Sequence, residues 1–221
     1  MPGGKNIFLS LLLFITLLSS SCQLDADDRI IRAVSSAQQT PAKSNYVKYK
    51  SQCQKIYADL KKHSGKVNEK QFINYINDSL FACWYGTKWD FNGTTETPGE
   101  GSIACGYFVT TLIRDAGIPI QRIKMAQCAS EEMIKTVSIP GSIKRFSNIA
   151  LNTVIESIKK TGFGLYVVGL DNHTGFLFND CKEVYFIHSC YLSPRCVVKE
   201  EAIKSVVLTQ SKYKVIGKLK I

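Results

Sequence analysis

The sequence contains no long apolar run in its 221 residues. No stretch reaches the roughly 18 to 20 consecutive apolar residues that a membrane-spanning helix needs, so a spanning segment is not expected. Internal repeats and low-complexity blocks are also missing. With 45% hydrophobic and 21% charged residues, the composition excludes a disordered chain and a large multidomain protein and predicts one globular domain with a small attachment.

Acidic residues are few: the sequence has 18 Asp and Glu and 28 Lys and Arg, which gives a net charge of +10. This charge favours anionic surroundings such as nucleic acid, phospholipid headgroups or an acidic cell-wall polymer. The basic residues are scattered rather than clustered, so nucleic-acid binding is not expected. No C-x-x-C pair is present, and neither a metal nor another cofactor is predicted.

The first 21 residues predict a signal peptide. Lys5 supplies a positive charge, residues 7–18 are an apolar stretch, and residues 19–21 are small serines. Cys22, directly after them, resembles the lipid-acceptor cysteine of bacterial lipoproteins. That resemblance implies a lipid anchor at Cys22 and a place in the bacterial cell envelope, at the outer membrane facing the periplasm. The alternative is an ordinary signal peptide that releases an exported protein.

Residues 22–44 are interpreted as anchor and flexible tether, because they are polar, contain Pro41 and lack a sustained apolar period. The folded domain is expected over residues 45–221. Without Cys22 the chain has seven cysteines, an odd number, so three disulfides would leave one free thiol. The pairing stays open over 15 connectivities, with a loop-closing Cys190–Cys196 bridge as the one specific expectation. The six candidates are Cys53, Cys83, Cys128, Cys181, Cys190 and Cys196.

Hydrophobic periodicity predicts helices first and strands afterwards, which is typical of an α+β domain. Asn68 and Gln71 have the spacing of a capping box, and Gly117 gives a stop signal after a short apolar helix. The expected helices cover 46–60, 72–80, 105–116, 130–136, 147–160 and 200–208; the expected strands cover 163–170, 173–178, 184–190, 195–198 and 213–219; and 84–103 is expected to be a long loop.

Cys105 lies at the first turn of the predicted helix 105–116. The helix dipole and free backbone N–H groups favour a thiolate there, which would lower the pKa of the thiol. A nucleophile also needs a base, and the base must be held by a further polar group. Among the three histidines, His63 ends a basic predicted helix and is given no role, whereas His173 and His188 lie on neighbouring predicted strands.

The predicted hairpin brings these two histidines together. If residues 179–182 form its four-residue loop, paired residues have numbers that sum to 361, and His173 stands opposite His188. Directly paired residues on one face have Cβ atoms roughly 4.5 to 5.5 Å apart. One imidazole can then orient the other, so the sequence predicts a Cys-His-His triad that depends on this register.

These residues resemble the motifs of NlpC-type papain-like cysteine peptidases, which cut bacterial peptidoglycan peptides. The resemblance covers residues 84–190 and rests on four segments in the family's order, namely Tyr-Gly-Thr-Lys-Trp-Asp-Phe-Asn-Gly at 85–93, Ala-Cys-Gly-Tyr-Phe-Val at 104–109, His-Thr-Gly-Phe-Leu at 173–177 and Phe-Ile-His-Ser at 186–189. Gly106 stands where the family commonly has Ser, and Trp89 where it often has Tyr. The family's Pro-Gly-Asp-Leu signature is absent.

The resemblance implies a papain-like fold with the nucleophile helix packed on an antiparallel sheet. It implies Cys105 as nucleophile, His173 as base and His188 as orienting residue, with Tyr85 or Trp89 assisting the backbone N–H of Cys105 at the oxyanion. The expected protein is a monomeric, exported hydrolase that cleaves amide bonds in peptidoglycan stem peptides. Two alternatives stay open, a lipid-directed acyltransferase or hydrolase of the same superfamily and a catalytically inactive cell-envelope binding module.

Overall fold

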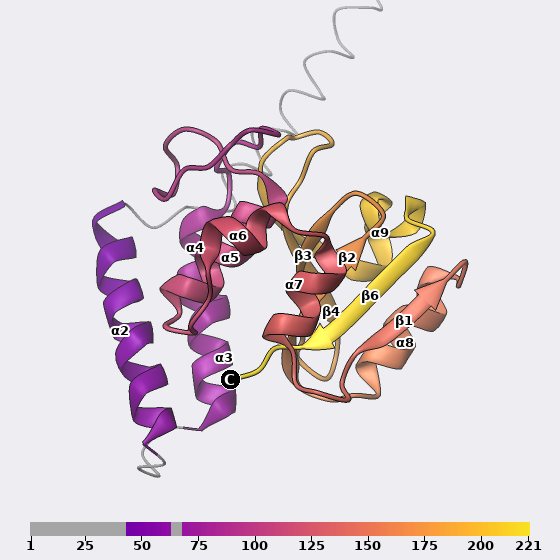
Figure 1. Cartoon of the computed structure of the whole chain (residues 1–221), viewed down its shortest axis with the longest axis horizontal. Coiled ribbons are helices and arrows are strands. Elements are labelled where there is room, and N and C mark those ends of the chain that lie inside the picture. Colours follow the sequence, from indigo (N-terminus) through magenta and orange to yellow (C-terminus); the bar gives the residue numbers. More distant parts are fainter. Residues whose placement is uncertain (1–42, 63–67) are drawn as a thin grey trace, which may run out of the picture. The chain divides into compact units, whose positions relative to one another are not determined.

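The computed structural model describes residues 43–62 and 68–221, and every described residue belongs to one compact unit. The predicted signal peptide, Cys22 and His63 lie outside these residues. A six-stranded antiparallel sheet forms the centre of the unit, with helices on both of its faces (Figure 1). The predicted α+β class is therefore confirmed.

The helices predicted over 46–60 and 72–80 are confirmed, and they form a helical hairpin at the beginning of the described chain. Its first arm is α2 (Lys43–Lys61), and its second is α3 (Glu69–Tyr75) continued by a π-helical turn (Ile76–Leu80) and α4 (Phe81–Trp84). The Asn68 side chain accepts a hydrogen bond from Gln71 N at 2.9 Å, and the Gln71 side chain accepts one from Asn68 N at 2.9 Å. The capping box read from the sequence thus starts the second arm.

The sheet has the strand order β1-β6-β2-β3-β4-β5. Its central strands β2 and β3 are buried along their whole length, which explains why their sequences are almost continuously apolar. The bounds are β1 (Lys144–Ser147), β2 (Gly164–Leu170), β3 (Thr174–Asn179), β4 (Val184–Ser189), β5 (Val197–Glu201) and β6 (Tyr213–Lys218).

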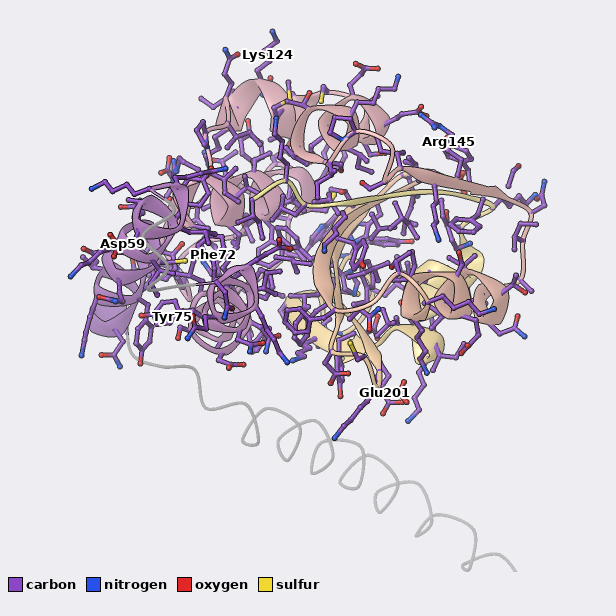
Figure 2. The ribbon with its side chains drawn as sticks, turned by 90° about the horizontal axis from the view of Figure 1, so that it is seen from below. Asp59, Phe72, Tyr75, Lys124, Arg145 and Glu201 are labelled. Atoms are coloured by element: carbon purple, nitrogen blue, oxygen red, sulfur yellow. The ribbon has the colours of Figure 1, made fainter. Side chains whose placement is uncertain are left out.

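Two apolar clusters fill the space on the two faces of the sheet. On one face the hairpin packs with α5 (Cys105–Asp115), α6 (Arg122–Gln127) and α7 (Ser130–Val137); on the other lie α8 (Leu151–Lys159), a 3₁₀ turn (Ala202–Lys204) and α9 (Val206–Gln210) (Figure 1). Helix α5 packs against β3 and β4. Phe72 of α3 is fully buried, whereas Lys124 and Arg145 extend outward (Figure 2).

Three elements differ from the sequence prediction. Helix α6 and strand β1 were not expected, because each has only a few residues and no apolar period of its own. The helix predicted over 200–208 is also wrong at its start, since β5 continues through Glu201 before the chain turns. Pairing of Tyr185 with Glu201 and of Phe186 with Glu200 keeps these acidic residues in the sheet.

None of the helices in the described ranges is long and apolar enough to cross a membrane.

A buried carboxylate ties the hairpin to the helix that begins at Cys105. Asp115, at the end of α5, is fully buried and accepts a hydrogen bond from Tyr46 Oη at 2.7 Å. The same carboxylate pairs with Lys50 Nζ at 2.9 Å and with Arg114 Nε at 2.8 Å. Burial, and then the charge of Asp115, raise the pKa of Tyr46, so the phenol remains a donor at neutral pH.

The variant Asp115→Ala is expected to lower the free energy of unfolding by about 2 to 3 kcal/mol, because a buried phenol and two cations lose their shared partner. Urea unfolding followed by circular dichroism measures the change. Glu132→Ala, which removes an exposed carboxylate paired with Lys135, is the control and should leave the unfolding midpoint unchanged. Equal midpoints for Asp115→Ala and the unmodified protein would contradict this role.

Candidate active site

Cys105 is the first residue of α5, and contacts on both sides fix its place. Before it, Ser189 Oγ of β4 donates a hydrogen bond to Ile103 O at 2.7 Å. After it, Gly106 lies so close to α6 that a Cβ there would be 2.4 Å from Ala126 O. The nucleophile candidate is therefore held between a sheet strand and a neighbouring helix.

Cys105 and His173 line the same cavity, which has a volume of about 220 Å³. The cavity lies between the start of α5, the α6–α7 connection and the β2–β3 turn, and Cys105 is half-buried in its wall. Its lining residues are Cys105, Gly106, Ala126, Cys128, Ser130, Met133, Leu170, Asp171, Asn172, His173 and Thr174. The structure thus brings together two of the three residues predicted for the triad.

His188 joins them through a direct hydrogen bond between the rings. His173 Nε2 and His188 Nδ1 are 2.8 Å apart, and both side chains are buried. The ring of Phe186 stacks on His188 with centroids 3.9 Å apart, while Tyr191 lies edge-on to His173 at 5.2 Å. These contacts leave both rings little freedom to rotate. Because Nε2 of His173 is hydrogen-bonded to His188, Nδ1 is the nitrogen left to exchange a proton with a group in the cavity.

The predicted register of this hairpin is wrong, although the two histidines do meet. Asn179 pairs with Val184 and Phe176 with Ile187, so paired numbers sum to 363 and not to 361. Asn179 belongs to the strand because its buried side-chain amide donates to Ile158 O and Gly162 O, each at 2.8 Å. Changing the sum by two keeps every side chain on its face, and His173 reaches His188 diagonally.

Gly175 makes room for this diagonal contact. A Cβ at Gly175 would lie 2.8 Å from His188 Cβ and 2.6 Å from Phe186 Cε2, distances that real side chains do not adopt. The glycine two residues after His173 thus has a steric reason, since the ring of His188 and its stacked neighbour occupy that space.

Burial keeps both imidazoles neutral. It lowers the pKa of His173 well below the ordinary 6.5, and a positive charge on His188 would lower it further. Burial also lowers the pKa of His188, and the nearby Glu200 carboxylate opposes this shift without cancelling it. At neutral pH each ring therefore carries one proton and keeps one nitrogen free as an acceptor.

The expectation of a lowered thiol pKa at Cys105 is wrong. Burial raises the pKa of Cys105 above its ordinary value, although backbone N–H groups of Thr174, Gly106 and Cys105 itself act in the opposite direction. Desolvation of the charged sulfur outweighs the helix N-terminus. The free protein therefore holds a neutral thiol beside a neutral imidazole rather than a preformed ion pair.

Tyr85 and Trp89, the candidates for oxyanion contact, are not among the residues that line the cavity. Tyr85 Oη is buried and has no hydrogen-bond partner among the described residues. Trp89 contacts Tyr191 with ring centroids 6.2 Å apart and lies under the Arg195 guanidinium at 4.6 Å. Trp89 is thus connected to His173 through Tyr191 and supports the outer side of the histidine pair.

Sequence reasoning missed Glu200, whose Oε1 lies 3.2 Å from His188 Nε2. The sequence placed Glu200 in a helix, so nothing connected it with the histidines. Its position in β5, two residues from the strand partner of His188, brings the carboxylate to the far side of the ring. A prediction that β5 extends to Glu201 would have placed Glu200 beside His188.

The expected disulfides do not form among the described residues, where all seven cysteines are free. In particular, the predicted Cys190–Cys196 bridge is wrong. These two residues are joined by a backbone hydrogen bond from Cys190 N to Cys196 O at 2.9 Å, which closes the loop without a covalent bond. Within the same residues no group of three or more His, Cys, Asp and Glu side chains is placed to hold a metal ion.

Comparison of the chain with protein-family models, with curated proteins and with solved structures gives no match. The resemblance to NlpC-type peptidases therefore stays a prediction, and the case for a function depends on the geometry of the site.

The variant Gly106→Ala is expected to lower the free energy of unfolding by about 1 to 3 kcal/mol, because the added methyl group must displace α6 from the start of α5. Urea unfolding measures it. The matched control is Gly164→Ala, where the nearest atom to a new Cβ is Lys218 Cε at 3.0 Å, the flexible part of a side chain. A larger loss in the Gly164 variant would show that the α5–α6 contact is not tight.

Proposed function

We propose that this protein is a cysteine hydrolase with a papain-like, NlpC-type arrangement that cleaves amide bonds in peptidoglycan stem peptides. One observation carries the proposal, the 2.8 Å hydrogen bond between His173 Nε2 and His188 Nδ1 in the wall of a cavity that Cys105 also lines. A thiol at a helix start, a buried imidazole and a second group that orients it are the parts that covalent acyl transfer requires.

The proposed reaction begins from the neutral thiol. Cys105 Sγ attacks the amide carbonyl while His173 Nδ1 takes the thiol proton, and a thioester forms as the protonated ring gives that proton to the leaving amine. Water, deprotonated by the same nitrogen, then releases the acid and restores the thiol. Cys105 and His173 share the cavity wall, but no hydrogen bond of Cys105 to the ring is found in the described residues, so the two groups must approach when substrate binds.

The substrate class is supported by sequence and charge. The net charge of +10 favours an anionic polymer, the predicted signal peptide directs the protein to the cell envelope, and the four motif segments of the NlpC family include the cavity residues Cys105 and His173. Anchoring at Cys22, a place at the outer membrane and a monomeric state belong to the same proposal.

Cys105→Ala is expected to abolish cleavage of purified muropeptides while leaving the fold intact, because the substitution removes the sulfur that forms the thioester. Liquid chromatography with mass spectrometry identifies the products, and circular dichroism checks the fold. Cys181→Ala is the matched control, since Cys181 is an exposed thiol in the β3–β4 turn and its loss should not change the rate. Turnover by Cys105→Ala equal to that of the unmodified protein would refute the mechanism.

The pH profile of kcat/KM should retain activity below pH 6.5. His173 must be neutral to accept a proton, and its pKa in the folded protein is lowered, so the acid limb is expected below the ordinary histidine value. Because the pKa of both histidines is lowered in the folded protein, the unfolded chain binds more protons below about pH 6.5, and the free energy of unfolding falls there. Circular dichroism at each pH therefore checks that the protein is still folded. An acid limb above pH 6.5 in folded protein would contradict the assignment.

A second candidate function is the envelope-binding module without catalysis. The raised pKa of Cys105 favours it, because an inert thiol needs no activation. The muropeptide digestion separates the two candidates, since a binding module would retain sedimentation with peptidoglycan and give no products.

A further inference from the structure

A carboxylate extends the histidine pair beyond the three residues that the proposed mechanism uses. Glu200 Oε1 lies 3.2 Å from His188 Nε2, on the side of the ring opposite His173. Glu200 also accepts a hydrogen bond from the side chain of Ser205. Ser205 is itself fully buried, and its Oγ accepts from Leu208 N at 3.2 Å at the start of α9. Ser205 thus links the carboxylate of Glu200, whose side chain is 35% exposed, to the start of α9.

We infer that Glu200 is a positioning residue that fixes the tautomers of His188 and His173 and so leaves Nδ1 of His173 unprotonated toward Cys105. This inference rests on the proposed function, because the unprotonated nitrogen matters only if it receives the thiol proton.

The tautomers follow from the donor and acceptor inventory of the three groups. An ionised carboxylate can only accept, so His188 Nε2 must carry the proton that points to Glu200. His188 is neutral, so its Nδ1 has a free lone pair and accepts a hydrogen bond from the N–H of His173 Nε2 at 2.8 Å. His173 is neutral as well, and its Nδ1 is therefore bare. The Glu200 carboxylate, at the end of this series of hydrogen bonds, therefore determines which nitrogen of each ring carries the proton.

The surroundings keep Glu200 ionised at neutral pH. Burial alone would raise the pKa of its carboxyl group, but the hydrogen bonds of His188 and Ser205 lower it overall. Another ionisable neighbour of Glu200 is the Cys190 thiol, whose pKa is raised by burial and by the Glu200 charge, so it remains uncharged. Lys199 and Glu201, on either side along β5, interact elsewhere, with Asn77 at 3.0 Å and with Lys204 at 2.8 Å.

The negative charge has a second effect on the reaction. When His173 takes the thiol proton it becomes a buried cation, and Glu200 is the carboxylate connected to it by hydrogen bonds through His188. Stabilisation of this cation exists only during the reaction, so its loss should lower kcat and leave KM nearly unchanged.

The first test observes the tautomers directly. Long-range ¹H–¹⁵N correlation spectra of the ¹⁵N-histidine-labelled domain distinguish protonated Nδ1 from protonated Nε2. Both His173 and His188 are expected as Nε2–H tautomers in the unmodified protein, and Glu200→Ala is expected to give mixed tautomers. Glu200→Gln retains a carbonyl acceptor and should restore the Nε2–H forms. Unchanged spectra in a folded Glu200→Ala protein would overturn the inference.

The second test uses muropeptide kinetics. Glu200→Ala is expected to lower kcat about 10- to 100-fold with KM changed less than about twofold, and Glu200→Gln to recover part of the loss. The control is Glu201→Ala, the neighbouring carboxylate at the periphery (Figure 2), which should behave as the unmodified protein. If Glu200→Ala does not fold, Glu200→Gln decides the matter, since an unchanged kcat in that variant would overturn the electrostatic role.

The two tests separate this inference from the proposed function. If Cys105→Ala remains active, the peptidase mechanism fails, yet the spectra still show whether Glu200 determines the tautomers. If Cys105→Ala is inactive and Glu200→Ala has the spectra and kcat of the unmodified protein, the mechanism stands and the role of Glu200 is refuted.

Discussion

The hydrogen bond between His173 and His188 is the constraint on which the rest of the site depends. It occupies one nitrogen of His173 and thereby selects the other for chemistry. The bond exists because two strands place the histidines diagonally on one face, because Gly175 leaves space for the ring of His188, and because Phe186 stacks on that ring. The last two features belong to the sheet, so β3 and β4 orient the ring of His173, which directly precedes β3.

Burial explains why this site differs from a preformed thiolate–imidazolium pair. Removing both groups from water disfavours their charged forms, which raises the pKa of Cys105 and lowers that of His173. The helix N-terminus acts on the sulfur in the expected direction but is the smaller effect. With both groups neutral, the folded protein does not bury a charge at this site, and in the proposed mechanism charges form only after substrate binds.

The sequence predicted the elements whose signals are local. The apolar period and the Asn68–Gln71 capping box located the helical hairpin, and Gly117 marked the end of α5. What it missed depends on distant contacts. The register of β3 and β4 is determined by Asn179, whose amide binds carbonyls some twenty residues earlier. Glu200 stays in a strand because β4 pairs with it, although its own segment has helical character.

The place of β6 has a consequence for how the domain is made. Tyr213–Lys218 lies between β1 and β2, although both precede it in the chain. During synthesis, β1 therefore has no strand partner until this segment has emerged from the ribosome, and such long-range pairing is slow to form. Strand β2, which already pairs with β3, obtains its second neighbour at the same late step, when β6 pairs with it. Cys105 is synthesised more than a hundred residues earlier, so the start of α5 is present in an incomplete chain until the last strand completes the sheet.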